Sequence, residues 1–344
     1  MRSKRNLTSS TGRWSALVAG TAALAATVPA QAQWTKHFRV GMQLAINVDA
    51  ELGVGGVQTI ASQPGVYDDG YVLVDDTGNA GGFTTFWGYD NATQHGQKGQ
   101  PADSITFTRT EAITVPDSTR TIDDSPYIGM ELAYGGPITR LGGTRLGWEV
   151  GYGLLPINIS DKRTLNGSAF RIFDIYDATG IVIPPPGYRG GPSGAEQPVI
   201  GADPFDGGDF TEGATISGPR TLDVYLHNFR FGPTLHWEFA RRWAVQGSAG
   251  GAVGIVTGEY KFNETITLES GGSNVNSGRI GTSEFVYGAY VNGVVLFHVE
   301  EHGDIYAGVQ FMTMSDTEVD EAGRRARLNL GGAFSFLIGV NWPF

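Results

Sequence analysis

The last eighteen residues alternate between apolar and small or polar side chains, and this alternation constrains the fold more than any other feature. Even-numbered positions from 328 to 344 carry leucine, phenylalanine, isoleucine, valine and tryptophan, with one glycine. Odd-numbered positions from 327 to 343 are mostly small or polar. A period of two places successive side chains on opposite faces of a β-strand. Because strands of soluble sheets usually have roughly five or six residues, a strand of this length is unusual in a soluble protein.

Seven further segments repeat the alternation. Their outward series include Phe38 to Val48, Ile128 to Tyr134, and Leu146 to Leu154. The others cover residues 228–239, 243–255, 285–299 and 304–311. Together with the final segment they make eight expected strands. The links alternate between long (49–125, 158–221, 261–282 and 316–326) and short (137–143, 240–242 and 300–303). An even number of antiparallel strands with alternating short turns and long loops is typical of transmembrane β-barrels.

Composition excludes the other common classes. Charged residues make up 17% of the chain, against roughly 25% in an average soluble protein, and 51 residues are glycine. No run of 18 apolar residues follows Gln33, so a helical membrane bundle is excluded and any membrane crossing must use strands. Cysteine is absent, which removes disulfides, thiolate metal sites and cysteine nucleophiles. The net charge of −11 makes nucleic acid a poor partner.

Residues 1–32 have the layout of a secretory signal peptide. A basic start precedes an apolar stretch from Ala16 to Val28, and Ala30-Gln31-Ala32 provides an A-x-A cleavage site. The apolar stretch is too short to span a bilayer comfortably. Cleavage would leave residues 33–344 as the mature chain, exported from the cytoplasm.

These observations predict an all-β fold, an antiparallel transmembrane up-and-down β-barrel of eight strands with long extracellular loops at 49–125 and 158–221. Both termini would lie on the periplasmic side of a bacterial outer membrane. Segments 83–89 and 104–115 have strand-like sequences, so ten or twelve strands remain an alternative.

Aromatic residues fall at the expected periplasmic ends of the strands, where an interfacial girdle belongs. They are Phe38, Trp237, Phe239, Trp243, Phe297, Trp342 and Phe344. The chain resembles the small eight-stranded outer-membrane barrels of the OmpA, OmpX and OmpW type. Its end resembles the C-terminal signal by which the barrel-assembly machinery recognises such proteins, carried here by Phe336, Ile338, Val340, Trp342 and Phe344. Pro343 departs from the common pattern of that signal.

The inward faces of the expected strands carry charges of both signs. An eight-stranded barrel is just wide enough for side chains to fill it, and buried charges are tolerated there only when paired. We therefore expect a salt-bridged plug, with a gated ion path as the alternative. The network would consist of Arg39, Glu131, Arg145, Glu149, Arg230, His236 and Glu238.

The long links are where binding residues are expected. Segment 49–125 contains twelve acidic residues against three basic ones. Its pairs Asp68-Asp69 and Asp75-Asp76 are weak calcium candidates, because oxygen ligands are present but the spacing matches no calcium loop. Arg324, Arg325 and Arg327 could contact lipopolysaccharide phosphates or form a solvated basic turn.

No catalytic residue is assigned from the sequence. Two possible catalytic sets are His227 with Ser160 or Ser283, and His95 with the acidic pairs. In a chain with six histidines, such sets are expected by chance. We expect a non-enzymatic structural or surface-binding protein without a cofactor, in contact with outer-membrane lipid, lipopolysaccharide and an unidentified extracellular ligand. A narrow pore or small-solute transporter is the first alternative, and an outer-membrane hydrolase is the second.

Overall fold

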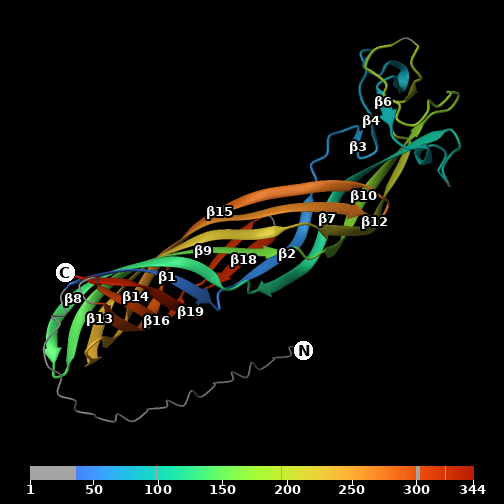
Figure 1. Cartoon of the computed structure of the whole chain (residues 1–344). Helices are drawn as coiled ribbons and strands as arrows, with labels where there is room; N and C mark the ends of the chain where they lie inside the picture. The colour runs from blue at the N-terminus through green and yellow to red at the C-terminus, as the bar shows by residue number, and fades with distance from the viewer. Residues whose placement is uncertain (1–35, 98, 195, 300–302, 322) are drawn as a thin grey trace, which may run out of the picture. The chain divides into compact units, whose positions relative to one another are not determined.

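In the computed structural model, eight of the strands close into a ring (Figure 1). The structure describes residues 36–97, 99–194, 196–299, 303–321 and 323–344. Neighbours along the ring are antiparallel, and the pairing of β13 with both β9 and β14 closes it. In ring order the strands are β13 (Arg220–Ala240), β9 (Thr144–Asp161), β8 (Tyr127–Leu141), β1 (His37–Ile46), β19 (Ala333–Pro343), β16 (Gly303–Met314), β15 (Ser273–Val299) and β14 (Trp243–Leu268). The proposed signal peptide, 1–32, lies outside the described residues.

The sheet contains fourteen strands, more than the eight expected, because six further strands adjoin the ring strands along the chain. For example, β2 follows β1 and pairs with β18 and β7, while β1 pairs with β19 and β8. Beyond the ring, β2 thus pairs with β18 and β7, the strands that directly precede β19 and β8 in the chain. The expected loops 49–125 and 158–221 contribute four of these strands, and β7 includes the strand-like segment 104–115. The six are β2 (Asp49–Thr59), β7 (Ser104–Ile122), β10 (Leu165–Asp177), β12 (Asp206–Ser217), β17 (Thr317–Glu321) and β18 (Arg324–Asn329).

The prediction of unbroken alternation through the last segment is wrong at its start. Residues 330–332 separate β18 from β19. Leu328 and Leu330, expected on the outer face, are buried, whereas Phe336 and Ile338 are exposed as expected. The inward positions Leu330 and Ala333 are three residues apart instead of two, and such a one-residue slip moves every later side chain to the other face.

The same inversion occurs between β1 and β2. Val48 was expected to face outward but is fully buried. Asn47, immediately before it, has a φ of 60°, the left-handed conformation that asparagine tolerates better than most residues. The chain therefore bends there, and the inward series passes from Ala45 to Val48.

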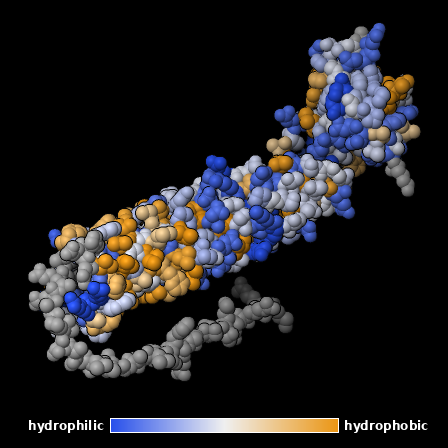
Figure 2. All heavy atoms as spheres, viewed as in Figure 1, coloured by the Kyte–Doolittle hydropathy of each residue, from blue (hydrophilic) through white to orange (hydrophobic). Residues whose placement is uncertain are grey.

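The outer surface of the ring is apolar. Exposed Phe229, Phe285, Val291 and Ile338 lie on it, and Figure 2 shows apolar side chains gathered there and hydrophilic ones over the strands beyond. At the end with the short turns, Trp243 packs on Phe297 with ring centroids 4.9 Å apart, and Phe38 pairs with Trp342. No helix in the described ranges is long and apolar enough to cross a membrane.

The interior is filled in layers that can be followed along β14. Gln246 and Ser248 belong to a polar layer, Val256 to an apolar cluster, Glu264 to a second charged layer, and Ile266 to a second apolar cluster. These residues are almost completely buried. Both faces of the ring wall are therefore defined: apolar outside, and alternately polar and apolar inside.

A small unit of short strands and loops, which we call the cap, packs at the end remote from the short turns. Its core is aromatic: Trp87 and Tyr89 are buried, and the ring centroids of Trp87 and Tyr188 are 4.7 Å apart. Phe107 of β7 and Tyr176 of β10 belong to the same core, so the cap is attached to the sheet. Its elements are β3 (Val66–Tyr67), β4 (Gly70–Val72), η1 (Ala80–Gly82), β5 (Phe83–Thr84), β6 (Trp87–Tyr89), η2 (Ala92–Gln94) and β11 (Ile200–Gly201).

Candidate binding site

The first charged group inside the ring centres on Glu149 of β9. Arg39 of β1 donates a hydrogen bond to it at 2.6 Å, and Gln246 of β14 donates another at 2.9 Å. His37 Nε2 lies 3.6 Å from the same carboxylate. Arg39 and Glu149 are both buried, so their attraction acts with little screening by water.

A second group joins Glu131 of β8 to β13 and β16. Arg230 of β13 donates to Glu131 at 2.6 Å, and the Tyr306 hydroxyl donates to its other oxygen at 2.8 Å. The Arg39 guanidinium lies over the Tyr306 ring, 5.3 Å from its centroid. Gly151 of β9, the strand between β8 and β13, leaves room for Arg230 to reach Glu131, since a Cβ there would lie 2.9 Å from Arg230.

The third group lies at the end of the ring with the short turns. Arg145 Nη1 is 3.2 Å from Glu238, and His236 Nε2 is 3.6 Å from the same carboxylate. Glu238 is partly exposed. All seven residues selected from the sequence thus lie in three groups inside the ring, where paired charges occupy space that water would otherwise fill.

A second buried charged layer, which no sequence pattern predicted, lies farther along the strands. Glu264 of β14 accepts hydrogen bonds from Arg220 of β13 and Arg324 of β18, and all three side chains are essentially inaccessible. Asp161 of β9 lies 4.0 Å from Arg220 and 2.8 Å from Arg163. We call Arg220, Glu264 and Arg324 the upper triad.

Of the three arginines considered for lipopolysaccharide, Arg324 is therefore buried and cannot reach a lipid headgroup. Arg325 pairs with Asp320 at 3.0 Å, and Arg327 pairs with Asp316 at 2.6 Å. Both remain about half exposed. Their carboxylate partners reduce the positive charge available to a phosphate.

The residues of the C-terminal pattern lie on the outer face of β19. Phe336, Ile338 and Trp342 are exposed there, Val340 is partly covered, and the terminal Phe344 stacks on Tyr134 with centroids 6.1 Å apart. The inward neighbours Ser335 and Leu337 are buried. Recognition of this pattern by an assembly machinery remains a prediction.

Asp75 organises a turn of the cap. Its carboxylate accepts hydrogen bonds from Thr77 and from the backbone N–H groups of Asn79 and Thr85. These bonds, that of the Thr77 side chain above all, lower the pKa of Asp75 to about 2. Its neighbour Asp76 is exposed. No cluster of three or more metal-ligating side chains occurs among the described residues, so the calcium prediction gains no support here.

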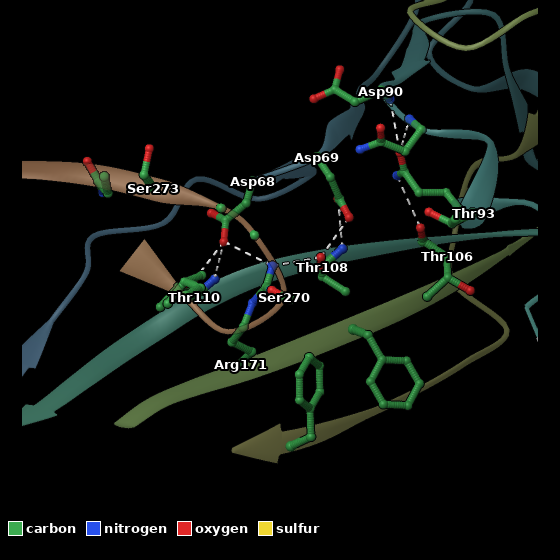
Figure 3. Close-up of a pocket in the computed structure, with 18 of the residues that line it drawn as sticks. Asp68, Asp69, Asp90, Thr93, Thr106, Thr108, Thr110, Arg171, Ser270 and Ser273 are labelled. Carbon is green, nitrogen blue, oxygen red and sulfur yellow. Dashed lines mark hydrogen bonds and ion pairs between the residues drawn. The ribbon is translucent and has the colours of Figure 1, made fainter. Parts of the chain in front are cut away.

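Asp68 and Asp69 line a cavity between the cap and the far ends of the strands (Figure 3). It has a volume of about 880 Å³. β7 and β10 form its walls, and residues 270–272 of the turn between β14 and β15 border it together with the first two residues of β15. Threonines 106, 108 and 110 project from one face of β7 toward it.

Arg171 of β10 connects the elements around this cavity. Its guanidinium donates to Glu212 of β12 at 2.8 Å, to Ser270 at 3.0 Å and to Thr108 at 2.8 Å. A longer contact of 3.3 Å reaches Asp68. Although burial acts in the opposite direction, the bonds from Arg171 and Ser270 lower the pKa of Glu212. A single buried guanidinium thus holds two strands, the turn and the cap in register.

Asp69 differs from Asp68 in having no cationic partner within ion-pairing distance among the described residues. Thr108 donates to it through the backbone N–H at 2.9 Å and the hydroxyl at 2.6 Å. Burial raises the pKa of Asp69, although these two bonds act in the opposite direction. The cavity therefore contains a carboxylate with free lone pairs.

The catalytic sets considered from the sequence are not assembled. The Nδ1 of His227 lies 2.9 Å from the Tyr152 hydroxyl on the outer face of the ring. Ser160 instead lies 3.3 Å from Thr221, and Ser283 lies opposite Thr257. His95 is exposed and forms only a backbone bridge to Ile105 among the strand pairings.

No family model matches the sequence, and no curated protein matches it. Among solved structures, the chain is similar to Ail, the attachment invasion locus protein of Yersinia pestis, crystallised with the heparin analogue sucrose octasulfate. The identity is 8%, the TM-score is 0.26, and the alignment covers 90% of this chain and 99% of that one. The outer membrane protease OmpT of Escherichia coli is 10% identical with a TM-score of 0.33, covering 90% and 97%. A FadL homologue of Pseudomonas aeruginosa is 11% identical with a TM-score of 0.20, covering 90% of each chain. At these TM-scores, no function can be transferred to this chain.

Proposed function

We propose that this protein is a non-enzymatic binding protein of the bacterial outer membrane. In this proposal the ring is a membrane anchor with a filled interior, and the strands beyond it hold the cavity at the cell surface. The observation that carries the proposal is the contrast across the ring wall. Large apolar side chains such as Phe285 are exposed on the outside, while Arg39, Glu149, Arg230 and Glu131 are buried inside as pairs.

Physical chemistry favours this arrangement in a membrane. A closed ring leaves no unpaired strand edge in hydrocarbon, and exposed apolar side chains are stable only against lipid or a partner. The charges inside are stabilised because each has an opposite charge within hydrogen-bonding distance. The apolar surface is the proposed contact with outer-membrane lipid, and lipopolysaccharide and the barrel-assembly machinery are its proposed partners.

Orientation follows from the position of the cavity. Barrels of this class carry short turns on the periplasmic side and long extensions outside. We therefore place the turn between β8 and β9, together with the chain end at Phe344, on the periplasmic side. The cap and the cavity then face the medium, where an extracellular ligand can reach them.

Cysteine labelling of intact cells tests this proposal at single sites, because each variant carries the one cysteine of the chain. Val182→Cys, at a cap position that is 90% exposed, should react with a membrane-impermeant maleimide in intact cells. Gly143→Cys, in the short turn where an added Cβ meets no atom within 4 Å, should react only after lysis. Both variants should fractionate with the outer membrane.

The opposite labelling pattern would reverse the orientation and reject surface display of the cavity. Recovery of both variants in the soluble fraction would reject the membrane anchor itself.

A further inference from the structure

The cavity beneath the cap has an excess of negative charge among its described lining residues. Three carboxylates, those of Asp68, Asp69 and Asp90, line it together with one guanidinium, that of Arg171. Arg171 is already shared between Asp68 and Glu212. Asp90 pairs with Arg189, which does not line the cavity. Asp69 is left without a counter-charge of its own, so the lining is complementary to a cation.

The cavity lining also contains two aromatic rings. Phe173 of β10 and Phe210 of β12 lie 6.3 Å apart, at an interplanar angle of 45°. Phe210 shares the inward face of β12 with the buried Ala214 and Ile216, yet it is 37% exposed. An inward-facing ring with that exposure is in contact with an open space. Such rings attract cations and pack against alkyl stems.

Phe210 already contacts a cation in this lining. The guanidinium carbon of Arg171 lies 5.7 Å from the centroid of its ring. Arg171 thus pairs with carboxylates and lies over this ring at the same time. A second cation nearer to Asp69 would meet the same combination of groups.

A buried hydroxyl in the wall has no partner in the described structure. Thr106 is almost inaccessible and lines the cavity, and its Oγ1 makes no hydrogen bond there. It lies on the same face of β7 as Thr108, which holds Asp69. A buried hydroxyl is normally satisfied, so an unpaired one beside a cavity points to a missing ligand or water.

We propose that the cavity binds an organic cation, a ligand that carries an ammonium or guanidinium group on a short alkyl stem. Asp69 is its counter-ion, and Phe173 and Phe210 contact the stem. This deepens the proposed function, because it names the ligand class of the surface-binding site. A carboxylate and two rings select a cation over a neutral molecule of the same size because only the cation gains from both.

Calorimetric titration of the purified full-length barrel in detergent tests the proposal, with agmatine as the probe. Agmatine carries a guanidinium group, and it is expected to bind saturably and more weakly as sodium chloride is raised. The neutral diol 1,4-butanediol should not bind. Asp69→Asn keeps the size of the side chain but removes its charge, and it should weaken agmatine binding by about tenfold, the loss of one charge-assisted contact. Asp76→Asn is the matched control: it removes the same charge from an exposed site outside the lining, and it should leave the affinity within about twofold.

Several results would overturn the proposal. Unchanged affinity in a folded Asp69→Asn variant would remove Asp69 as the counter-ion. If that variant fails to fold, the unmodified protein still provides a test. Agmatine binding that does not depend on salt, or equal binding of the diol, would show that the cavity does not select a cation. Binding of maltose without agmatine would identify a neutral saccharide site instead. Absence of all binding, with Val182→Cys still labelled at the cell surface, would reject the cation site while leaving the surface-display proposal standing.

Discussion

Glu264→Leu is expected to destabilise the protein by about 3–5 kcal/mol, because it leaves two buried guanidinium groups without their shared carboxylate. Arg220 and Arg324 are essentially inaccessible and lie between two apolar clusters, so neither can turn to water. Asp161, 4.0 Å from Arg220, offers partial compensation only to that side chain. Urea unfolding of the purified barrel, followed by tryptophan fluorescence, measures the change in the free energy of unfolding.

A compensated variant separates lost charge pairing from lost volume. Replacing the whole upper triad (Arg220→Met, Glu264→Leu and Arg324→Met) removes all three charges and keeps apolar bulk in the layer. It should recover most of the stability, because well-packed apolar residues often match a buried ionic triad. If Glu264→Leu alone were as stable as the unmodified protein, the upper triad would not be the closed layer described here.

Glu149→Leu is expected to cost a similar amount, about 3–5 kcal/mol, by leaving Arg39 unpaired within the ring. The Gln246 amide would lose its acceptor at the same time, which adds to the penalty. Glu238→Leu is the matched control. Its carboxylate also pairs with an arginine, but Glu238 is 20% exposed and its partner is 15% exposed, so water can replace the contact. We expect the control to cost about 1 kcal/mol or less.

The comparison of Glu149→Leu with Glu238→Leu is read from the same urea curves. Equal effects at the two positions would mean that the interior around Glu149 is hydrated, which is incompatible with a plug. Arg39→Met combined with Glu149→Leu should recover most of the loss, because it removes the orphaned charge.

The ring strands could be predicted from sequence because the apolar outer face and the paired charges inside impose opposite demands on alternate residues. Segments such as 145–154 and 228–239 are read correctly for this reason, and so are the inward positions of Arg39 and Glu149. Beyond the ring, in the proposed orientation, the outer face would meet water instead of lipid. Polar residues then occur on both faces of strands such as β15, and the period of two is lost from the sequence.

The breaks between strand segments explain the remaining errors. At Asn47 and at residues 330–332 the inward face changes parity, so Val48, Leu328 and Leu330 are assigned to the wrong side. Arg324 was assigned to an exposed turn for a different reason: residues 316–326 were expected to be a loop, whereas β18 begins at Arg324. A search for apolar residues three apart across a break, such as Leu330 and Ala333, would have indicated these inversions.

The cavity could not be predicted from local patterns. Asp69, Thr108 and Arg171 come from a cap loop and two different strands, and their contacts join residues 39 to 103 positions apart. The only local signal was the pair Asp68-Asp69. Threonines at 106, 108 and 110 place hydroxyls on one face of a strand. This pattern would have supported the prediction of a binding cavity.

Planar-bilayer recording measures directly whether the ring is an anchor filled by paired charges. An eight-stranded ring packed with side chains should insert without carrying a steady current, whereas porins of sixteen to eighteen strands enclose an aqueous channel. Purified, folded protein should show no sustained conductance of porin size at any applied voltage that the bilayer tolerates. A steady, porin-sized current from that protein would mean that the ring encloses an open channel and is not filled by paired charges.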